Sequence, residues 1–318
     1  MKFLLSLFLI LSSSLFTGFV SCNSYSSKPA KINTLDIEEN TLDEYWYQGK
    51  AEISRFELQQ ARYGEIHEGD AVMVFVTEDF RTDIQVKLDN EANKDKAINI
   101  LKLNLIREFP TGVYDYSAMT SVFTPVDDYK TDRCLKITNS VQEWCGHVFT
   151  QLNWTEGKRY DVKSFSYFEA DGDQTTELKA PHLEDEIWNI IRINPKNLPL
   201  GRIEIVSSIL FSRLGHKSLR AIEADALLDL YDGEEFEGEE LMEYQLIYPE
   251  HNRTLKIVYE NVAPYTIQGF QEIYKAPVWA GGEMLTTTAK RTHTILSDYW
   301  NKHSLKDRVL REELGLKK

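Results

Sequence analysis

The sequence is poor in the residues that mark several specialised protein classes. It has three cysteines, 16 glycines and 9 prolines in 318 residues, too few for a disulfide scaffold or for a collagen-like or low-complexity chain. Basic residues are also in the minority, since 36 Lys and Arg face 50 Asp and Glu and the net charge is −14. Because nucleic acid repels such a chain, this balance argues against non-specific nucleic-acid binding.

Common catalytic motifs are absent too. The chain has no Gly-x-Ser-x-Gly, no His-Glu-x-x-His and no Gly-x-x-x-x-Gly-Lys-Ser. The sequence therefore gives no support to a serine hydrolase, a zinc protease or a P-loop enzyme. What it does have is 42% hydrophobic and 12% aromatic residues, enough to bury a large core.

The first 22 residues have the pattern of an export signal. Lys2 precedes an apolar, serine-rich run that ends at Cys22, which predicts a signal peptide over residues 1–21. A cysteine directly after Phe19-Val20-Ser21 resembles the lipobox of bacterial lipoproteins, in which the cysteine becomes the acylated first residue. The resemblance implies lipidation of Cys22 and a lipid bilayer as partner, because several acyl chains at about 0.8 kcal/mol per buried CH₂ anchor a protein durably.

The segment after Cys22 predicts where the protein is held. Residues 22–43 begin serine-rich and show no alternation, so we expect a flexible tether with a reach on the order of 25 Å. Surface-exported lipoproteins of Bacteroidota tend to carry acidic residues directly after the cysteine, and Asn23-Ser24-Tyr25-Ser26-Ser27-Lys28 carries none. We therefore expect a cell-envelope protein anchored in the outer membrane and facing the periplasm.

The rest of the chain reads as strand after strand. Fourteen runs between Lys50 and Leu296 are rich in Val, Ile, Thr, Tyr and Phe, and they include Arg133 to Thr138, Glu143 to Leu152 and Ile203 to Phe211. This pattern predicts a mainly β protein whose antiparallel sheets form a large, partly open barrel or a sandwich.

One segment has helical spacing instead. Leu183, Ile187, Ile190 and Ile191 recur at that spacing behind an acidic first turn, which predicts one amphipathic helix near 182–193. This helix divides the strands into a β-rich part over 44–180 and a second part over 181–318, forming either one continuous domain or two.

The two remaining cysteines suggest a disulfide. With Asn139-Ser140 as the centre of a tight hairpin, Cys134 faces Cys145, and opposed cysteines in an exported protein are candidates for a disulfide. The alternative is a metal or nucleophilic site made of Cys145, His147 and Asp132. A structural cystine or two buried thiols is the interpretation we favour, because this spacing is a weak motif.

A second polar cluster comprises Glu65, His67, Glu68 and Asp70. Carboxylates beside a histidine can bind a divalent cation, but the composition is more typical of a solvated turn. We therefore expect no metal and no cofactor, and keep His67 and Glu65 as weak polar-site candidates.

Several segments resemble a known group of proteins from about residue 45 to the C-terminus. They are Tyr45-Trp46-Tyr47-Gln48-Gly49-Lys50, Val141-Gln142-Glu143-Trp144-Cys145-Gly146-His147, Arg192-Ile193-Asn194-Pro195, Leu198-Pro199-Leu200-Gly201 and Tyr299-Trp300. The chain resembles an uncharacterised family of Bacteroidota lipoproteins often labelled "septum formation inhibitor Maf". True Maf proteins are cytosolic nucleoside-triphosphate pyrophosphatases with a Ser-x-Ser-Pro-Arg-Arg motif, and this chain has no Ser-Pro dipeptide. The resemblance therefore implies a lineage but no catalytic residues.

These patterns together favour a membrane-anchored, non-catalytic binding module for an apolar ligand, an envelope component or a partner protein. Aromatic residues such as Trp279 either fill the core or line a concave pocket, and the second case requires a cavity of several hundred Å³. The alternative function is a metal-dependent or Cys/His-based envelope hydrolase, in which His147 or His67 meets carboxylates from distant strands. A further alternative, implied by the Maf label alone, is a nucleotide pyrophosphatase. The absence of the Ser-x-Ser-Pro-Arg-Arg motif argues against this activity.

Overall fold

A computed structural model describes residues 44–126, 133–155, 159–179 and 182–316. Within these ranges the chain is mainly β, which confirms the expected fold class. Its strands form one large sheet in which all neighbours are antiparallel except the pair β10 and β11. Cys22, Asp132 and the expected tether lie outside the described residues.

The elements follow one another in long antiparallel runs. The strands before the expected helix are β1 (Ala51–Arg62), β2 (Glu65–Arg81), β3 (Val86–Lys87), β4 (Ala97–Thr111), β5 (Tyr114–Pro125), β6 (Lys136–Glu143), β7 (Gly146–Thr155), β8 (Arg159–Ser166), β9 (Gln174–Leu178) and β10 (His182–Leu183). Those after it are β11 (Gly201–Val206), β12 (Ala221–Leu230), β13 (Leu241–Tyr248), β14 (Arg253–Glu260), β15 (Ile267–Lys275) and β16 (Met284–Ser297). The α-helices are α2 (Ile187–Ile193), α3 (Ile209–Leu214) and α4 (Val309–Glu313), and the 3₁₀ turns are η1 (Glu91–Lys96), η2 (Glu184–Glu186), η3 (Pro195–Asn197), η4 (Pro249–His251), η5 (Val278–Ala280), η6 (Tyr299–Asn301) and η7 (Leu305–Arg308).

The sheet joins the two halves of the chain through its middle. β1 pairs with β16 from Ala51 opposite Ser297 to Gln59 opposite Thr288, so the order runs from β10 through β16 to β1 and on to β9. The end strands β9 and β10 are not paired with each other in the described chain. The sheet is therefore curved but open.

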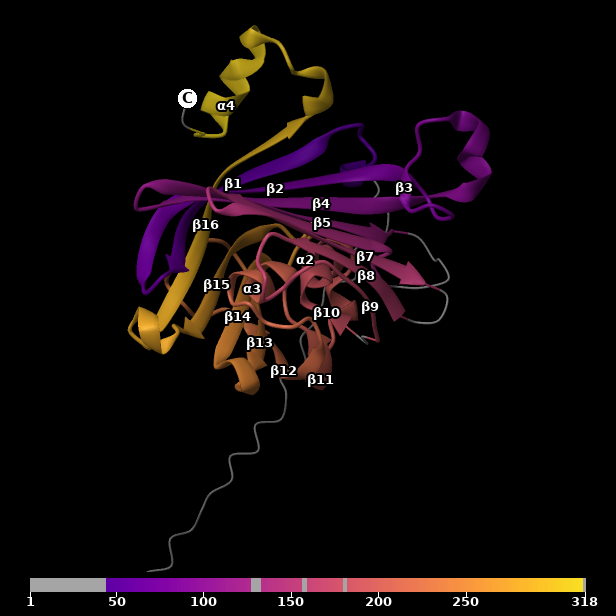
Figure 1. Ribbon diagram of the computed structural model, residues 1–318. Helices are drawn as coiled ribbons and strands as arrows, with labels where there is room; N and C mark the ends of the chain where they lie inside the picture. The colour runs from indigo at the N-terminus through magenta and orange to yellow at the C-terminus, as the bar shows by residue number, and fades with distance from the viewer. Residues whose placement is uncertain (1–43, 127–132, 156–158, 180–181, 317–318) are drawn as a thin grey trace, which may run out of the picture. The chain divides into compact units, whose positions relative to one another are not determined.

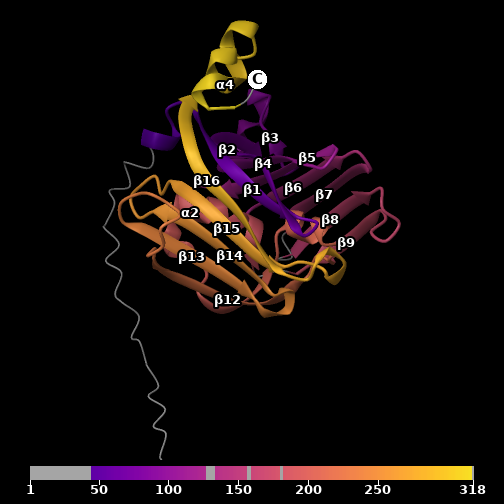
Figure 2. The same cartoon turned by 90° about the vertical axis from the view of Figure 1, so that its left-hand side faces the viewer.

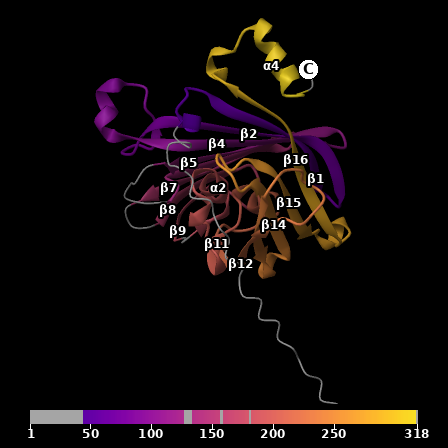
Figure 3. The same cartoon turned by 180° about the vertical axis from the view of Figure 1, so that it is seen from behind.

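The curved sheet encloses α2 and α3 (Figures 1 and 2). The side chain of Asn189 on α2 donates a hydrogen bond to the Leu101 carbonyl of β4 at 3.0 Å, and the Trp188 ring lies 5.3 Å from that of Phe270 on β15. Strands from both halves thus contact the same helix, as the view from behind also shows (Figure 3). The main hydrophobic core lies between the helices and the inner face of the sheet.

The expected helix exists, but its polar side does not face solvent. The acidic turn η2 and the polar residues of α2 are buried, with Glu184, Glu186 and Arg192 each at most 2% exposed. The amphipathic helix predicted near 182–193 is thus present, with its polar side buried as well as its apolar side. The segment lies inside the curved sheet, where its polar side chains find charged partners on the strands.

A second helix was not expected. The run Ile203 to Phe211 was interpreted as one strand, whereas β11 ends at Val206 and α3 begins at Ile209. Short apolar runs do not distinguish a strand from a buried helix. The change of structure matters because α3 forms one wall of a cavity.

Three ion pairs connect the η2–α2 segment to the sheet. Arg192 binds Glu52 of β1 through two hydrogen bonds of 2.6 Å. Glu184 accepts two bonds from Arg253 of β14, at 2.5 and 2.6 Å, and Glu186 lies 2.6 Å from Arg133. Burial by itself raises the pKa of Glu52, but the Arg192 guanidinium outweighs burial and holds that pKa below its ordinary value.

The outer face of the sheet carries the C-terminal segment. Leu314, directly after α4, packs with Ile53 of β1 and Val74 of β2 in a small separate core, and α4 lies on that side in Figure 1. No helix among the described residues is long and apolar enough to cross a bilayer.

We expect Arg192→Met to lower the free energy of unfolding by roughly 3–5 kcal/mol, because it leaves the Glu52 carboxylate buried without a counter-ion. Urea denaturation measures the change. Arg202→Met is the matched control, since its pair with Asp225 is exposed, and we expect little change there. Adding Glu52→Leu to the Arg192 variant should recover part of the loss, and a strictly additive double variant would contradict the ion-pair explanation.

Candidate functional site

The structure does not bring the two cysteines together. Cys134 is buried before β6, with its Sγ 3.4 Å from the Tyr160 hydroxyl, and Cys145 is exposed; both are free thiols. The hairpin turn is Trp144-Cys145, because β6 continues to Glu143 and Glu143 pairs with Gly146. The predicted disulfide is therefore wrong, since the cysteines lie at opposite ends of a strand, about 30 Å apart at the usual rise per residue.

The misplaced turn has a physical cause. Asn139-Ser140 has the composition of a turn, but Asn139 is buried and donates to the Thr120 hydroxyl of β5 at 2.9 Å. That bond satisfies the amide within the sheet. The true turn is supported instead by the Glu143 carboxylate, which accepts from the Cys145 backbone N–H at 2.6 Å.

The two candidate histidines do not meet. His147 is exposed on β7, while His67 is half-buried on β2 with its Nε2 3.1 Å from the Arg62 carbonyl oxygen. Three strands separate β2 from β7, which corresponds to about 19 Å between strand axes. Glu65 and His67 lie in β2 rather than in a turn, so the expected solvated turn is wrong there. No group of three or more potential metal ligands occurs among the described residues.

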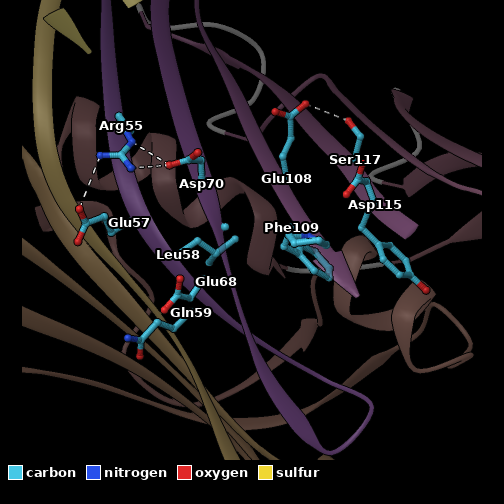
Figure 4. Close-up of a pocket in the computed structure, with 13 residues that line it drawn as sticks. Arg55, Glu57, Leu58, Gln59, Glu68, Asp70, Glu108, Phe109, Asp115 and Ser117 are labelled. Atoms are coloured by element: carbon cyan, nitrogen blue, oxygen red, sulfur yellow. Dashed lines mark hydrogen bonds and ion pairs between the residues drawn. The ribbon is translucent and has the colours of Figure 1, made fainter. Parts of the chain in front are cut away.

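A broad groove lies on the outer face of β1, β2, β4 and β5. It has a volume of about 800 Å³, and Figure 4 shows Arg55 pointing toward Asp70 and Glu57, with Glu108 pointing toward Ser117. The Arg55 Nε donates to Asp70 at 2.8 Å. Arg55 is thus engaged by two carboxylates of the groove, and the acidic cluster by itself indicates no ligand.

A smaller cavity lies on the inner side, against α3. Its volume is about 480 Å³, and we call it the α3 cavity. It is bounded by the end of β1, the β1–β2 turn, Arg107 of β4, α3 with the turn after it, η4, β15 and the β15–β16 loop. This is an aromatic-lined cavity of the size that the ligand-binding interpretation requires.

The β1–β2 turn places an aromatic ring at the cavity. Arg62 pairs with Glu65, so Tyr63 and Gly64 form a two-residue turn with φ of 53° and 85°, the conformation that tight hairpins prefer. A Cβ on Gly64 would lie 2.4 Å from the Ala280 carbonyl oxygen. Glycine therefore allows this turn to approach the β15–β16 loop, and the Tyr63 ring lies 6.1 Å from that of Trp279.

The apolar lining comes from both α3 and β15. Phe211 of α3 and Tyr274 of β15 have ring centroids 6.2 Å apart, and Leu210 and Leu214 add aliphatic surface. Together with Tyr63 and Trp279 they form most of an apolar wall.

One buried cation of the cavity, which lies 4.7 Å from the Phe270 ring centroid, lacks a close hydrogen-bonding partner. Arg107 is 6% exposed, its Nη1 lies 3.5 Å from Glu272, and its Nε has no hydrogen-bond partner in the described structure. Burial lowers the pKa of Arg107, and Glu272 opposes that effect only in part. Glu272 accepts a shorter bond, 2.7 Å, from Arg253.

Two neighbouring groups are also incompletely bonded. Gln60 donates to Ala61 and Thr287, but its Oε1 has no partner among the described residues. Arg62 donates to the Leu214 carbonyl at 2.7 Å, and its Nε lacks a partner. Buried polar atoms are normally satisfied, so three such side chains around one cavity indicate room for a ligand with polar atoms.

The cavity is positive in an acidic protein. Its lining includes the four cations Arg62, Arg107, Lys217 and Lys275 and the single carboxylate Glu272, so four minus one leaves three positive charges when its histidines are neutral. The whole chain carries −14. The electrostatics of the site therefore favour an anionic ligand.

The position of α3, and with it the cavity wall, depends on the η2 turn. The Asp185 carboxylate accepts from the Ile209 backbone N–H at 2.9 Å, at the first residue of α3. Burial, followed by the nearby Glu184, raises the pKa of Asp185 from 3.8 to about 6. This contact ties α3 to the same segment that holds α2.

A third cavity lies beside the α3 cavity. It has a volume of about 470 Å³, and we call it the β8–β9 cavity; it is lined by hydroxyl groups of β7 to β9 and by Arg213. His216 and Lys217 line both cavities. Arg213 also has an unpartnered buried Nε, and its guanidinium lies 4.4 Å from the Phe168 ring centroid.

Comparisons with known proteins add little to this site. No family model and no curated protein matches the chain. Among solved structures, the chain is similar to the crystal structure of a β-barrel-like protein of a domain of unknown function, DUF1849, from Brucella abortus. That chain is 7% identical, the match covers 78% of this chain and 98% of the other, and the TM-score is 0.47.

We expect Asp185→Asn to change how stability depends on pH. The native pKa lies above the unfolded one, so the native state binds more protons between about pH 4 and 6, and the stability contributed by Asp185 is lost as the pH rises through 6. The asparagine variant keeps an acceptor for Ile209 without the charge. The free energy of unfolding of the variant minus that of wild type should therefore be about 3 kcal/mol larger above pH 6 than at pH 4.

Urea denaturation of both proteins across this pH range measures the effect. Asp161→Asn, at an exposed position, controls for the loss of one negative charge. A wild-type to variant difference that stays constant from pH 4 to 8 would show that Asp185 is ionised throughout.

Proposed function

We propose that the protein is a lipid-anchored envelope protein that binds an apolar ligand, without catalysis, in the α3 cavity. The observation that carries this proposal is a cavity of about 480 Å³ with four aromatic side chains and incompletely bonded polar groups. A mostly apolar lining with a few polar groups is typical of small-molecule sites.

The lining also suits binding better than nucleophilic catalysis. No serine, threonine or cysteine is among the described residues that line the cavity. Of its two histidines, His216 has its Nδ1 3.3 Å from Asp171, and His251 packs its ring beside those of Phe211 and Tyr248. The groups that remain can donate hydrogen bonds and provide positive charge, which hold a ligand in place.

We expect Leu214→Trp to fill part of the cavity and to weaken binding of the neutral dye N-phenylnaphthylamine by about tenfold or more. The measurement is dye fluorescence on the full mature chain carrying Cys22→Ser, which removes the acylation site. Leu219→Trp is the matched control, because Leu219 is also half-buried but lines the β8–β9 cavity.

Thermal unfolding of both variants verifies that they are folded. If the dye binds wild type and both variants equally, its site is not the α3 cavity. If folded wild type does not bind the dye or any other apolar probe, the proposed function is wrong.

The anchoring part of the proposal rests on the sequence. The export pattern over residues 1–21 and the lipobox-like Phe19-Val20-Ser21 before Cys22 support acylation in the cell envelope, in line with the proposed Bacteroidota lipoprotein lineage. An acyl anchor suits this protein, because an acidic surface gains no attraction from anionic headgroups. We propose that the anchored protein faces the periplasm.

We expect Cys22→Ser to abolish incorporation of labelled palmitate and to shift the protein from the membrane pellet to the soluble fraction. Cys145→Ser serves as the control, since it removes an exposed thiol and should leave both readouts unchanged. If Cys22→Ser still incorporates labelled palmitate, Cys22 is not the acylated residue and this part of the proposal is wrong.

A further inference from the structure

We propose that the ligand of the α3 cavity is an amphiphile whose head group is a singly charged oxyanion, with a long-chain carboxylate as the type, and that Arg107 binds this head group. The inference rests on the proposed binding function and names the chemical class of the ligand. It follows from the unmet bonding of Arg107, the positive charge of the lining and the apolar wall of the same cavity.

Arg107 is buried and has hydrogen-bond donors that no acceptor in the described structure satisfies. A guanidinium carries five N–H donors, yet the one hydrogen bond from Arg107 among the described residues is the 3.5 Å contact with Glu272. A buried charge with unmet donors is costly. Ligand oxygens in the cavity would supply the missing acceptors in the two-point geometry that arginine prefers for oxyanions.

The neighbouring carboxylate does not fill this role. Glu272 is bound more closely by Arg253, at 2.7 Å, and Arg253 also donates two hydrogen bonds to Glu184. Arg107, Arg253, Glu184 and Glu272 balance one another in charge. Arg62, Lys217 and Lys275 form no ion pair among the described residues and leave the lining positive for an anionic ligand.

The position of Glu272 beside Arg107 limits the head group to one negative charge. Glu272 lies at the guanidinium that would bind the head group, so a second negative charge there would be repelled by its carboxylate. Both the carboxylate of a fatty acid and a phosphodiester satisfy this limit, whereas a phosphate monoester, with a charge of about −1.5 to −2 at pH 7, does not.

The rest of the cavity suits a hydrocarbon body. Leu210, Phe211 and Leu214 line one side of the cavity and Tyr274 and Trp279 line others. These side chains would remove the chain of an amphiphile from water at about 25 cal/mol per Å² of apolar surface. Cationic side chains and an apolar wall in one cavity thus select an amphipathic anion.

The test compares ligands of equal chain length. Dodecanoate, dodecanol and dodecyl phosphate compete with N-phenylnaphthylamine, below micelle-forming concentrations, on the full mature chain carrying Cys22→Ser. We expect dodecanoate to bind about tenfold to a hundredfold more tightly than dodecanol, because only the acid makes charge-assisted bonds. Dodecyl phosphate should bind more weakly than dodecanoate.

Variants assign the effect to Arg107. In Arg107→Met the ratio of dodecanoate affinity to dodecanol affinity should fall to about one, with dodecanol binding retained. Arg107→Lys should keep part of the preference, because lysine keeps the positive charge but cannot donate two parallel hydrogen bonds as arginine does. Arg213→Met is the matched control, because Arg213 also has an unpartnered buried Nε but lines the β8–β9 cavity, and its preference should equal that of wild type.

The outcomes separate the two proposals. Equal binding of acid and alcohol by wild type overturns the head-group inference and leaves the binding function in place. A preference that survives in folded Arg107→Met also overturns it, and tighter binding of dodecyl phosphate overturns the single-charge limit. If neither the dye nor any of the three amphiphiles binds, both proposals fall.

Discussion

Buried charge is the constraint on which the rest of this structure depends. The segment from Glu184 to Arg192 carries charged side chains into the interior of a curved sheet, where an unpaired charge would cost several kcal/mol. Three of these side chains form ion pairs: Glu184 with Arg253, Glu186 with Arg133, and Arg192 with Glu52. The fourth, Asp185, accepts a hydrogen bond from the Ile209 backbone N–H instead. Because Glu52 and Arg253 lie on strands far apart in the sequence, and Arg133 lies just before β6, the pairing requires the sheet to curve around the helix.

The candidate site follows from the same constraint. Asp185, within this segment, holds the first turn of α3, and α3 forms the wall of the cavity. Arg253 holds Glu184 and also draws Glu272 toward itself, which leaves Arg107 with one long contact. The interior is therefore well packed and charge-balanced around α2, but open and incompletely bonded beside α3. The proposed ligand site thus lies where the network of ion pairs ends.

Much of the fold can be predicted from local patterns, whereas the site cannot. Alternation in β4 places Leu101, Leu103 and Leu105 inward, and the same alternation places Arg107 inward; a charged residue at an inward position was a signal that sequence reasoning could have used. The Tyr63-Gly64 turn has a recognisable composition as well. By contrast, Asn139-Ser140 was misinterpreted as a turn because its buried amide finds Thr120 on a neighbouring strand, and no local pattern shows a partner across the sheet.

The sequence by itself determined the mainly β class, the existence of a helix after residue 182 and the acidic balance, because these depend on periodicity and composition along the chain. The tertiary structure alone decided that the polar side of this helix is buried, that Cys134 and Cys145 lie apart, and that cations gather around one cavity. Those properties depend on which strands become neighbours when the sheet curves. Partners chosen by long-range charge pairing leave no trace in the spacing of nearby residues.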